Sequence, residues 1–277
     1  MASVGSAVLG LLVLGAVFWP LEHWRAALPE QPRRRCDLRT DVAYWFVSSL
    51  VTRLVSDTAV VITVFVVALA IGVPPTAQSM QRYFDDPTQL VRSQPMWLQA
   101  FEALFVADLA GYWIHRLFHG GTLWKFHAVH HSSTHVDWLS SVRLHPVNDA
   151  LMRIPQALLI LALGFPPTVL VAYLPAVVIY GIFLHANVPW DFGPLRHVMA
   201  SPAFHRWHHT SLAEGRDRNF AGIFPIIDIV FGTFHLPRGR QPSAFGVGGE
   251  AVPRGIWAQM LYPFRRTQIV AEGTPRP

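Results

Sequence analysis

Three histidine clusters restrict the fold of this chain more than any other feature of its sequence. The first is His115-Arg-Leu-Phe-His119, and the second is His127-Ala-Val-His-His131. The third, His205-Arg-Trp-His-His209, repeats the spacing of the second far downstream. Residues three and four apart lie on one face of a helix, so each cluster predicts a helical face that carries two or three imidazoles. We therefore expect a fold in which three such faces converge.

A histidine array of this density predicts a metal centre. Neutral imidazole suits iron, zinc, copper or nickel. The clusters hold more imidazoles than one four- to six-coordinate ion uses, so we expect two ions. The predicted ligands from the clusters are His115, His119, His127, His130, His131, His205, His208 and His209. A lone histidine is usually an ordinary surface or core residue, and we interpret His23, His197 and His235 in that way. His135 follows His131 by four residues, but Ser132, Ser133 and Thr134 weaken the helix there, so we expect it to be peripheral.

The composition predicts an integral membrane protein. Of the 277 residues, 52% are hydrophobic and only 14% are charged, whereas soluble domains have about 25% charged residues. The formal net charge is +5. Most arginines stand beside apolar runs, which favours contact with a membrane surface and speaks against nucleic acid as a partner. Cys36 is the one cysteine in the sequence, which excludes an intrachain disulfide and a thiolate metal site.

Long apolar segments predict the membrane spans. Residues 4–20 form an unbroken apolar run close to the ~17-residue lower limit for a spanning helix, and residues 43–73 and 96–118 form two further runs. Residues 151–184 are also apolar, with Gly164-Phe165-Pro166-Pro167 in their middle. Because proline pairs end helices, we expect residues 151–184 to form a helical hairpin that enters the membrane and returns to the same side.

Basic residues orient the expected spans. The loop at residues 21–40 is rich in arginine, so the positive-inside rule places it in the cytoplasm. Its arginines are Arg25, Arg33, Arg34, Arg35 and Arg39. The loop at residues 74–95 has only Arg82 and Arg92 as basic residues, and we expect it on the opposite side. The next span then returns the first histidine cluster to the cytoplasmic face.

These expectations combine into an all-α fold. It is a multi-span transmembrane helix bundle with a cytoplasmic helical cap that carries the histidine clusters. We divide the chain into N-terminal spans and loops (1–95), a metal domain that includes the membrane hairpin (96–236) and a C-terminal tail (237–277).

The motifs around the clusters closely resemble the fatty acid hydroxylase/sterol desaturase superfamily, whose members are integral-membrane di-iron enzymes. The resemblance extends roughly from Asp108 to Phe234 and includes several motifs in the order of the family. They are Asp108-x3-Tyr112-x2-His115-Arg116-x2-His119, Trp124-x-Phe126-His127-x-Val129-His130-His131-Ser132, Arg143-x-His145-Pro146, His185-x-Asn187, Ser201-Pro202-x2-His205-x2-His208-His209, and Asp217-x-Asn219-Phe220 through Phe231-Gly232-Thr233. The resemblance implies two iron ions, held by the eight cluster histidines and by His185 as a ninth ligand.

Metal-bound imidazoles usually need a hydrogen-bond partner for their second nitrogen. Asp108 and Tyr112 precede His115 at helical spacing, and we expect them to supply such partners. We also expect His145 and Asn187 close to the metals, without counting His145 among the ligands. Relatives often carry an acid shortly after the His-Pro pair, where this chain has Asn148 and Asp149.

The resemblance implies an oxygenase that hydroxylates or desaturates a lipid C–H bond with dioxygen and external electrons. Hydroxylation is preferred because the motifs are closest to the hydroxylase and sterol-oxidase type. The sequence has no nicotinamide, flavin or iron–sulfur motif, so we expect a separate ferredoxin or cytochrome with its reductase. The arginines expected to form its docking surface are Arg206, Arg216 and Arg218.

Two rival functions predict different sequences. A metal transporter or metal store would place ionisable residues along the spans, where this chain has few apart from Arg53, Asp57 and Asp108. A zinc hydrolase needs three or four ligands rather than eight. Zinc can still replace iron in a purified sample, because ligand type alone does not fix the metal.

Overall fold

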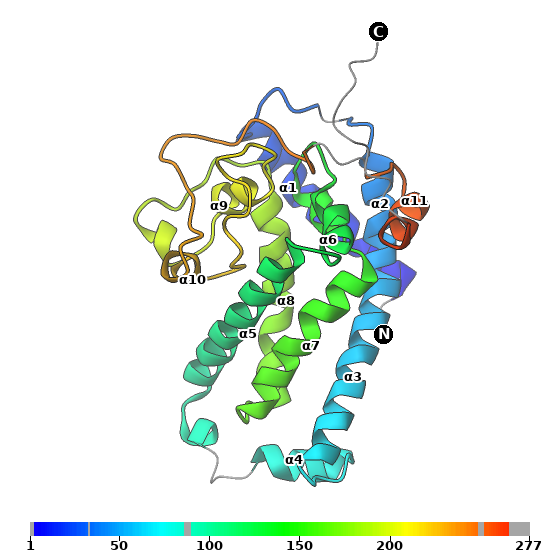
Figure 1. The fold of residues 1–277 in the computed structure, drawn as a ribbon, viewed down its shortest axis with the longest axis vertical. Coiled ribbons are helices and arrows are strands. Elements are labelled where there is room, and N and C mark those ends of the chain that lie inside the picture. The colour runs from blue at the N-terminus through cyan, green and yellow to red at the C-terminus, as the bar shows by residue number, and fades with distance from the viewer. Residues whose placement is uncertain (1–2, 33, 86–89, 249–251, 266–277) are drawn as a thin grey trace.

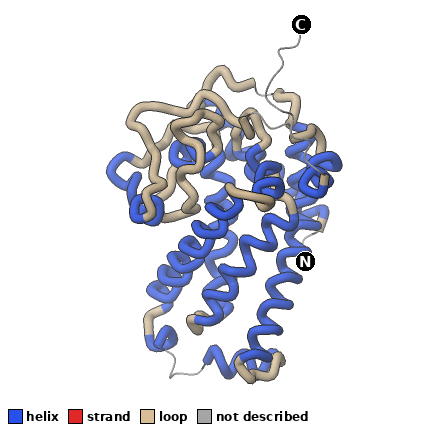
Figure 2. The backbone as a smooth tube through the Cα atoms, in the orientation of Figure 1, coloured by secondary structure: helices blue, strands red, loops and turns tan. Residues whose placement is uncertain are grey.

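The computed structural model describes residues 3–32, 34–85, 90–248 and 252–265. Within those ranges the regular elements are all helices, which confirms the predicted all-α class (Figure 2). A single isolated bridge pairs Thr210 with Phe245 in the loops. Arg33 of the arginine-rich loop and residues 266–277 of the predicted tail lie outside the described ranges.

The N-terminal part forms two long apolar helices. Helix α1 spans Val4–Trp24 and starts at Ser3, whose hydroxyl accepts the backbone N–H of Ser6. Helix α2 (Leu38–Val47) continues through a short π-helical turn into α3 (Arg53–Ala70). Both α1 and the continuous stretch Leu38–Ala70 are long and apolar enough to cross a membrane, with mean hydropathies of 2.1 and 2.0.

The predicted third span and hairpin are also helical. Helix α5 covers Met96–Phe118, α7 covers Pro146–Ala162 and α8 covers Pro167–His185. The break between α7 and α8 falls where the sequence predicted it. Gly164 there has a φ of 79°, and a positive φ after the end of a helix is usually adopted by glycine. Helix α8 then begins with a proline in its first turn.

The helices divide the molecule into a bundle and a cap. Figure 1 shows α3, α5, α7 and α8 side by side, with α4 (Ala77–Asp85) at the end away from the cap. The cap contains the short helices α6 (Trp124–His131), α9 (Pro202–His208), α10 (Ile226–Val230) and α11 (Ile256–Leu261). Long apolar side chains such as Leu12, Leu54 and Phe101 point outward from the helices. This outer surface is suited to lipid rather than water.

An aromatic core fastens the N-terminal helices to the cap. Trp138, in the loop after α6, stacks on Phe18 of α1 with ring centroids 5.9 Å apart and meets Trp45 of α2 edge-on at 6.1 Å. The indole N–H of Trp45 donates to the carbonyl of Ala7 at 2.8 Å, so this buried polar group is satisfied. The core thereby fixes the loop that follows the second histidine cluster.

Candidate metal centre

The structure brings nine imidazoles together where the cap meets the bundle. They form two adjoining groups, and within each group the ring nitrogens lie within 4.8 Å of one another. Group 1 contains His115, His119, His127, His131 and His208. Group 2 contains His130, His185, His205 and His209. These are the eight histidines of the three clusters and His185.

The second and third clusters each contribute to both groups. Helix α6 directs His127 and His131, four residues apart, into group 1 and turns His130 into group 2. In helix α9 and His209, which ends it, the two groups are exchanged. His205 and His209, four residues apart, belong to group 2, and His208 belongs to group 1. Offsets of three and four residues differ by about 100° around a helix. The expectation that each cluster points in a single direction was therefore wrong.

The two groups touch through stacked rings. The imidazoles of His131 in group 1 and His209 in group 2 have centroids 4.4 Å apart and an interplanar angle of 25°. His185 enters group 2 from the end of α8, with its Nε2 3.2 Å from Nε2 of His130 and 3.1 Å from Nε2 of His205. Helix α8 thus delivers its histidine to the same place as the two cap helices.

Backbone carbonyls hold the outer nitrogens of several rings. Nδ1 of His115 donates to the carbonyl of Phe220 at 2.8 Å, and Nδ1 of His208 donates to the carbonyl of Arg218 at 2.8 Å. Nδ1 of His130 lies 3.2 Å from the carbonyl of Arg143. A carbonyl oxygen can only accept, so each Nδ1 carries the hydrogen and each Nε2 presents a lone pair to its group.

The inner nitrogens form a donor set that suits metal ions. Nε2 of His127 lies 3.0 Å from Nε2 of His115 and 3.1 Å from Nε2 of His131. Nε2 of His119 and of His208 are buried and have no hydrogen-bond partner among the described residues. Converging lone pairs repel one another unless a cation lies between them, and a buried unpaired acceptor is costly. The residues present therefore fit two bound metal ions.

Burial keeps the cap imidazoles neutral. Loss of hydration first, and the neighbouring rings second, hold the pKa of each of these histidines well below its ordinary value. The rings concerned are His127, His130, His131, His205, His208 and His209. Neutral imidazole is the form that binds metal, so these ligands need not lose a proton near pH 7.

Two polar side chains complete the support of group 1. Oδ1 of Asn148 accepts from Nδ1 of His127 at 3.0 Å, at the position after the His-Pro pair where we noted a difference from the relatives. Oδ1 of Asp217 accepts from Nδ1 of His119 at 2.9 Å, and this hydrogen bond lowers the pKa of the Asp217 carboxyl. Sequence reasoning gave Asp217 no role; the Asp217-x-Asn219 motif was the available signal.

We predicted that Asp108 contacts an imidazole, but its described partners are backbone groups of a loop. Its carboxylate accepts backbone N–H groups from Gly222, Ile223 and Phe224 at 2.8, 3.0 and 2.7 Å. These residues follow Phe220, whose carbonyl accepts from a group 1 histidine. Asp108 therefore holds the loop that supports the ligand rather than the ligand itself.

We also predicted that Tyr112 hydrogen-bonds to an imidazole, but its hydroxyl bonds to Thr233 instead. Its hydroxyl lies 3.0 Å from Oγ1 of Thr233, which in turn donates to Asp228 at 2.6 Å. The buried Asp228 carboxylate accepts the backbone N–H groups of Phe220 and Ala221. Tyr112 and Asp108 thus brace the same loop from two directions, and sequence reasoning missed the part of Asp228.

His145 and Asn187 lie outside both groups. His145 caps α7: its Nδ1 accepts the N–H of Val147 and its Nε2 donates to the carbonyl of Met260, both at 3.2 Å. The side-chain amide of Asn187 pairs with both backbone groups of Leu28, which fastens the end of α8 to the loop after α1. The structure also leaves the other four histidines outside the groups, as the sequence predicted: His23, His135, His197 and His235.

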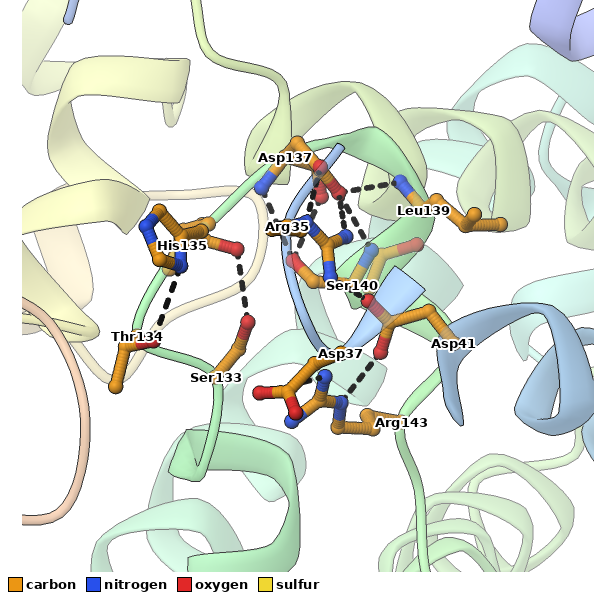
Figure 3. Close-up of polar contacts among 12 residues, drawn as sticks. Arg35, Asp37, Asp41, Ser133, Thr134, His135, Asp137, Leu139, Ser140 and Arg143 are labelled. Atoms are coloured by element: carbon orange, nitrogen blue, oxygen red, sulfur yellow. Dashed lines mark hydrogen bonds and ion pairs between the residues drawn. The ribbon is translucent and has the colours of Figure 1, made fainter. Parts of the chain in front are cut away.

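A buried ion-pair network positions the loop between α6 and α7. The carboxylate of Asp41 accepts from Arg35 and from Arg143, and all three side chains are at most 1% exposed (Figure 3). Arg35 also binds Asp137 at 2.7 Å. The carbonyl of Arg143 is the partner of His130, so this network sets the position of a group 2 ring. Arg35 is therefore buried inside the fold, unlike Arg34 and Arg39 of the same loop, which are exposed.

Arg206 is likewise buried rather than exposed. It is 0% exposed, donates from Nη1 to the carbonyl of Val136 at 2.7 Å and lies over the ring of Phe245 at 4.9 Å. Because α9 is enclosed on all sides, Arg206 cannot belong to a docking surface. Arg216 and Arg218 remain exposed.

Comparisons with known proteins identify a family and several relatives. The fatty acid hydroxylase family matches residues 100–233. The chain is 35% identical to the ornithine lipid hydroxylase OlsE of Rhizobium tropici over 62% of this chain and 52% of that protein. It is 34% identical to the alkylglycerol monooxygenase of Danio rerio, and 32% identical to that of Homo sapiens, over 50% of this chain and 30% of each relative. The chain thus spans about half the length of these relatives or less, and no solved structure matches it.

Proposed function

Residues 100–233 place this chain in the fatty acid hydroxylase family, and from that premise we propose that it is a membrane-bound di-iron oxygenase that hydroxylates a lipid C–H bond. The observation that carries the proposal is the pair of imidazole groups with converging Nε2 atoms. Group 1 would hold one iron through five histidines, and group 2 would hold the other through four. The bound ions would supply the reduction of dioxygen and the oxidation of the C–H bond.

The protein's own groups orient the ligands and keep water away. Carbonyls and side chains fix the outer nitrogen of several rings, so the Nε2 of each of those rings stays aimed at its ion. Asn148 and Asp217 do this for His127 and His119. The carboxylate of Asp217 adds negative charge beside its ring, which strengthens His119 as a donor to a cation.

The overall reaction consumes external electrons. Hydroxylation of a bond R–H needs one dioxygen, two electrons and two protons, and it yields R–OH and one water. A ferredoxin or cytochrome with its reductase would supply the electrons, since the sequence carries no motif for a redox cofactor of its own. Arg216 and Arg218 offer exposed positive charge to an acidic donor protein.

The bundle would cross the membrane and the cap would lie in the cytoplasm. The stretch Leu38–Ala70 has the length and hydropathy of a span and continues through α3 into the bundle, whereas α1, which is also long and apolar, lies beside the cap (Figure 1). In this proposal α5 is a further span and α7 with α8 is a hairpin that returns to the cap side (Figure 1). The exposed arginines at the cap-side ends of α1 and α2 support this orientation: Arg25, Arg34 and Arg39.

Hydroxylation is favoured over the alternatives. The relatives named above are a hydroxylase and monooxygenases rather than desaturases. Both names refer to polar lipids, and a site at a membrane surface is accessible to such molecules. A transporter would distribute its metal ligands along the spans, whereas the imidazoles here gather at one end of the bundle.

Reconstitution tests the proposal. Iron-loaded protein in vesicles of host lipid extract should yield hydroxylated lipid, measured by mass spectrometry, when ferredoxin, its reductase and NADPH are supplied under air. Omission of either the reductase or dioxygen should abolish the product. Lipid oxidation that continues without dioxygen or without reductant would contradict the proposed reaction.

A further inference from the structure

A cavity of about 260 Å³, with both polar and apolar groups in its wall, borders group 1 on the side of the cap. Three of the group 1 histidines form part of its wall, so a molecule in the cavity touches the metal centre directly: His119, His131 and His208. The rest of the wall consists of Trp124, Thr210, Ser211, Arg216, Asp217 and Gly246–Gly248.

The wall suits a polar group better than a hydrocarbon chain. Arg216 and Asp217 place opposite charges at the cavity, and Thr210 and Ser211 add hydroxyls. An acyl chain would strip water from these groups and return no hydrogen bond, which is costly. Asp217 is already engaged with His119, whereas Arg216 lies at the mouth beside Gly248. Within the part of the chain that the structure describes, Arg216 forms no ion pair, so its guanidinium suits a phosphate or carboxylate.

The size of the cavity points to part of a lipid rather than a whole one. Pockets that enclose complete small molecules usually measure about 300–1,000 Å³. At about 260 Å³, this cavity falls just below that range. It has room for a polar headgroup, while the tails of the same lipid would remain in the bilayer.

Exposed apolar side chains place the metal centre at the depth of the headgroups. In Figure 1, α10 and α11 lie on opposite flanks of the molecule, near the level where α5 ends and α6 lies. Val230 of α10 is 69% exposed and Trp257 of α11 is 79% exposed. Short apolar segments with exposed tryptophan are typical of the membrane–water boundary. With that boundary at the height of the metals, the nearest carbons are those of the headgroup and glycerol.

We propose that the cavity binds the anionic part of a lipid headgroup through Arg216, and that the oxidised carbon lies in the headgroup or glycerol rather than in the acyl tail. This inference rests on the proposed oxygenase function. The reaction keeps the same balance: one oxygen atom enters a C–H bond near the head, the other leaves as water, and the external donor supplies two electrons.

The site of oxidation tests the inference separately from the activity. In the reconstituted vesicles, tandem mass spectrometry should find the added oxygen in headgroup or glycerol fragments. Oxygen found in acyl fragments would overturn the inference and leave the oxygenase proposal intact. No oxidised lipid under complete conditions would overturn both. Deacylated host lipids should react poorly, and oxidation of them as fast as of intact lipids would show that the cavity serves a soluble substrate instead.

Two matched variants test the role of the guanidinium. Arg216→Gln should raise KM for the lipid about tenfold or more, because a charge-assisted hydrogen bond is lost, while the KM for ferredoxin rises by a smaller factor through the loss of one exposed charge. Arg238→Gln removes an exposed arginine that does not line the cavity, and it should leave both constants unchanged. An unchanged KM for the lipid in Arg216→Gln, or a rise only in the KM for ferredoxin, would refute headgroup recognition by this residue.

Discussion

Replacement of Asp41 by asparagine should strongly destabilise the protein. The Asp41 carboxylate is fully buried and compensates the guanidinium groups of Arg35 and Arg143. Asp41→Asn keeps the shape of the side chain. Of the carboxylates in the described part of the chain, the two cations then keep Asp137, at 2.7 Å, and Asp37, at 3.6 Å. Removal of one partner from a buried ion pair costs about 3–5 kcal/mol.

This loss is large enough to measure by thermal unfolding. For chains of comparable size, 1 kcal/mol shifts Tm by about 2–4 °C, so Asp41→Asn should lower Tm by roughly 6–20 °C. The ten tryptophans provide the fluorescence signal, and both proteins should be compared in the same metal-loaded state. Because the carbonyl of Arg143 positions His130, the variant should also bind its group 2 metal more weakly.

An exposed pair in the same cap provides the control. Arg240 and Glu214 are 2.6 Å apart, with side chains 58% and 39% exposed. Exposed pairs contribute about 0–1 kcal/mol, so Glu214→Gln should change Tm by less than roughly 4 °C. If Asp41→Asn lowers Tm no more than Glu214→Gln does, the buried network does not hold the loop, and the reasoning is refuted.

Three further predictions concern the metal centre. His208→Ala should reduce the metal content measured by elemental analysis and abolish activity, whereas His23→Ala should change neither; full activity in the first variant would remove it from the ligand set. Asn148→Ala should lower kcat/KM about 10–100-fold through the loss of its bond to His127, and an unchanged value would show that the bond is dispensable. The metal-free protein should lose stability as pH falls below about 6.5, because the unfolded histidines take up protons there while the folded ones, with lowered pKa, do not; melting curves independent of pH would contradict this.

The helices could be predicted because their signals are local. The apolar run at 96–118 matches α5 residue for residue, and the hairpin turns at the glycine and prolines in its middle. Proline and glycine act on the backbone within a few residues, so their effect does not depend on the rest of the fold. The set of clustered histidines was also visible from spacing, since helical periodicity alone places imidazoles together.

The division of the histidines between two groups could not be predicted from spacing. It depends on how α6 and α9 are rotated against each other, and that rotation follows from tertiary packing. The contact between Asp41 and Arg143 joins residues 102 positions apart, and the motif that contains Arg143 does not indicate Asp41 as its partner. Asp108 is a second case in which local spacing was insufficient. Its spacing suggested contact with His115, but in the fold its carboxylate binds the loop at Gly222–Phe224 instead.

The fate of isotopically labelled dioxygen tests the central claim most directly. Iron-loaded protein with lipid extract, ferredoxin, reductase and NADPH should be incubated under ¹⁸O₂, and the lipid product analysed by mass spectrometry. The proposed reaction predicts one labelled oxygen atom in each hydroxylated lipid, with none derived from water. Unlabelled product, or label that enters from ¹⁸O-water instead, would contradict the assignment of the two histidine groups to an oxygenase.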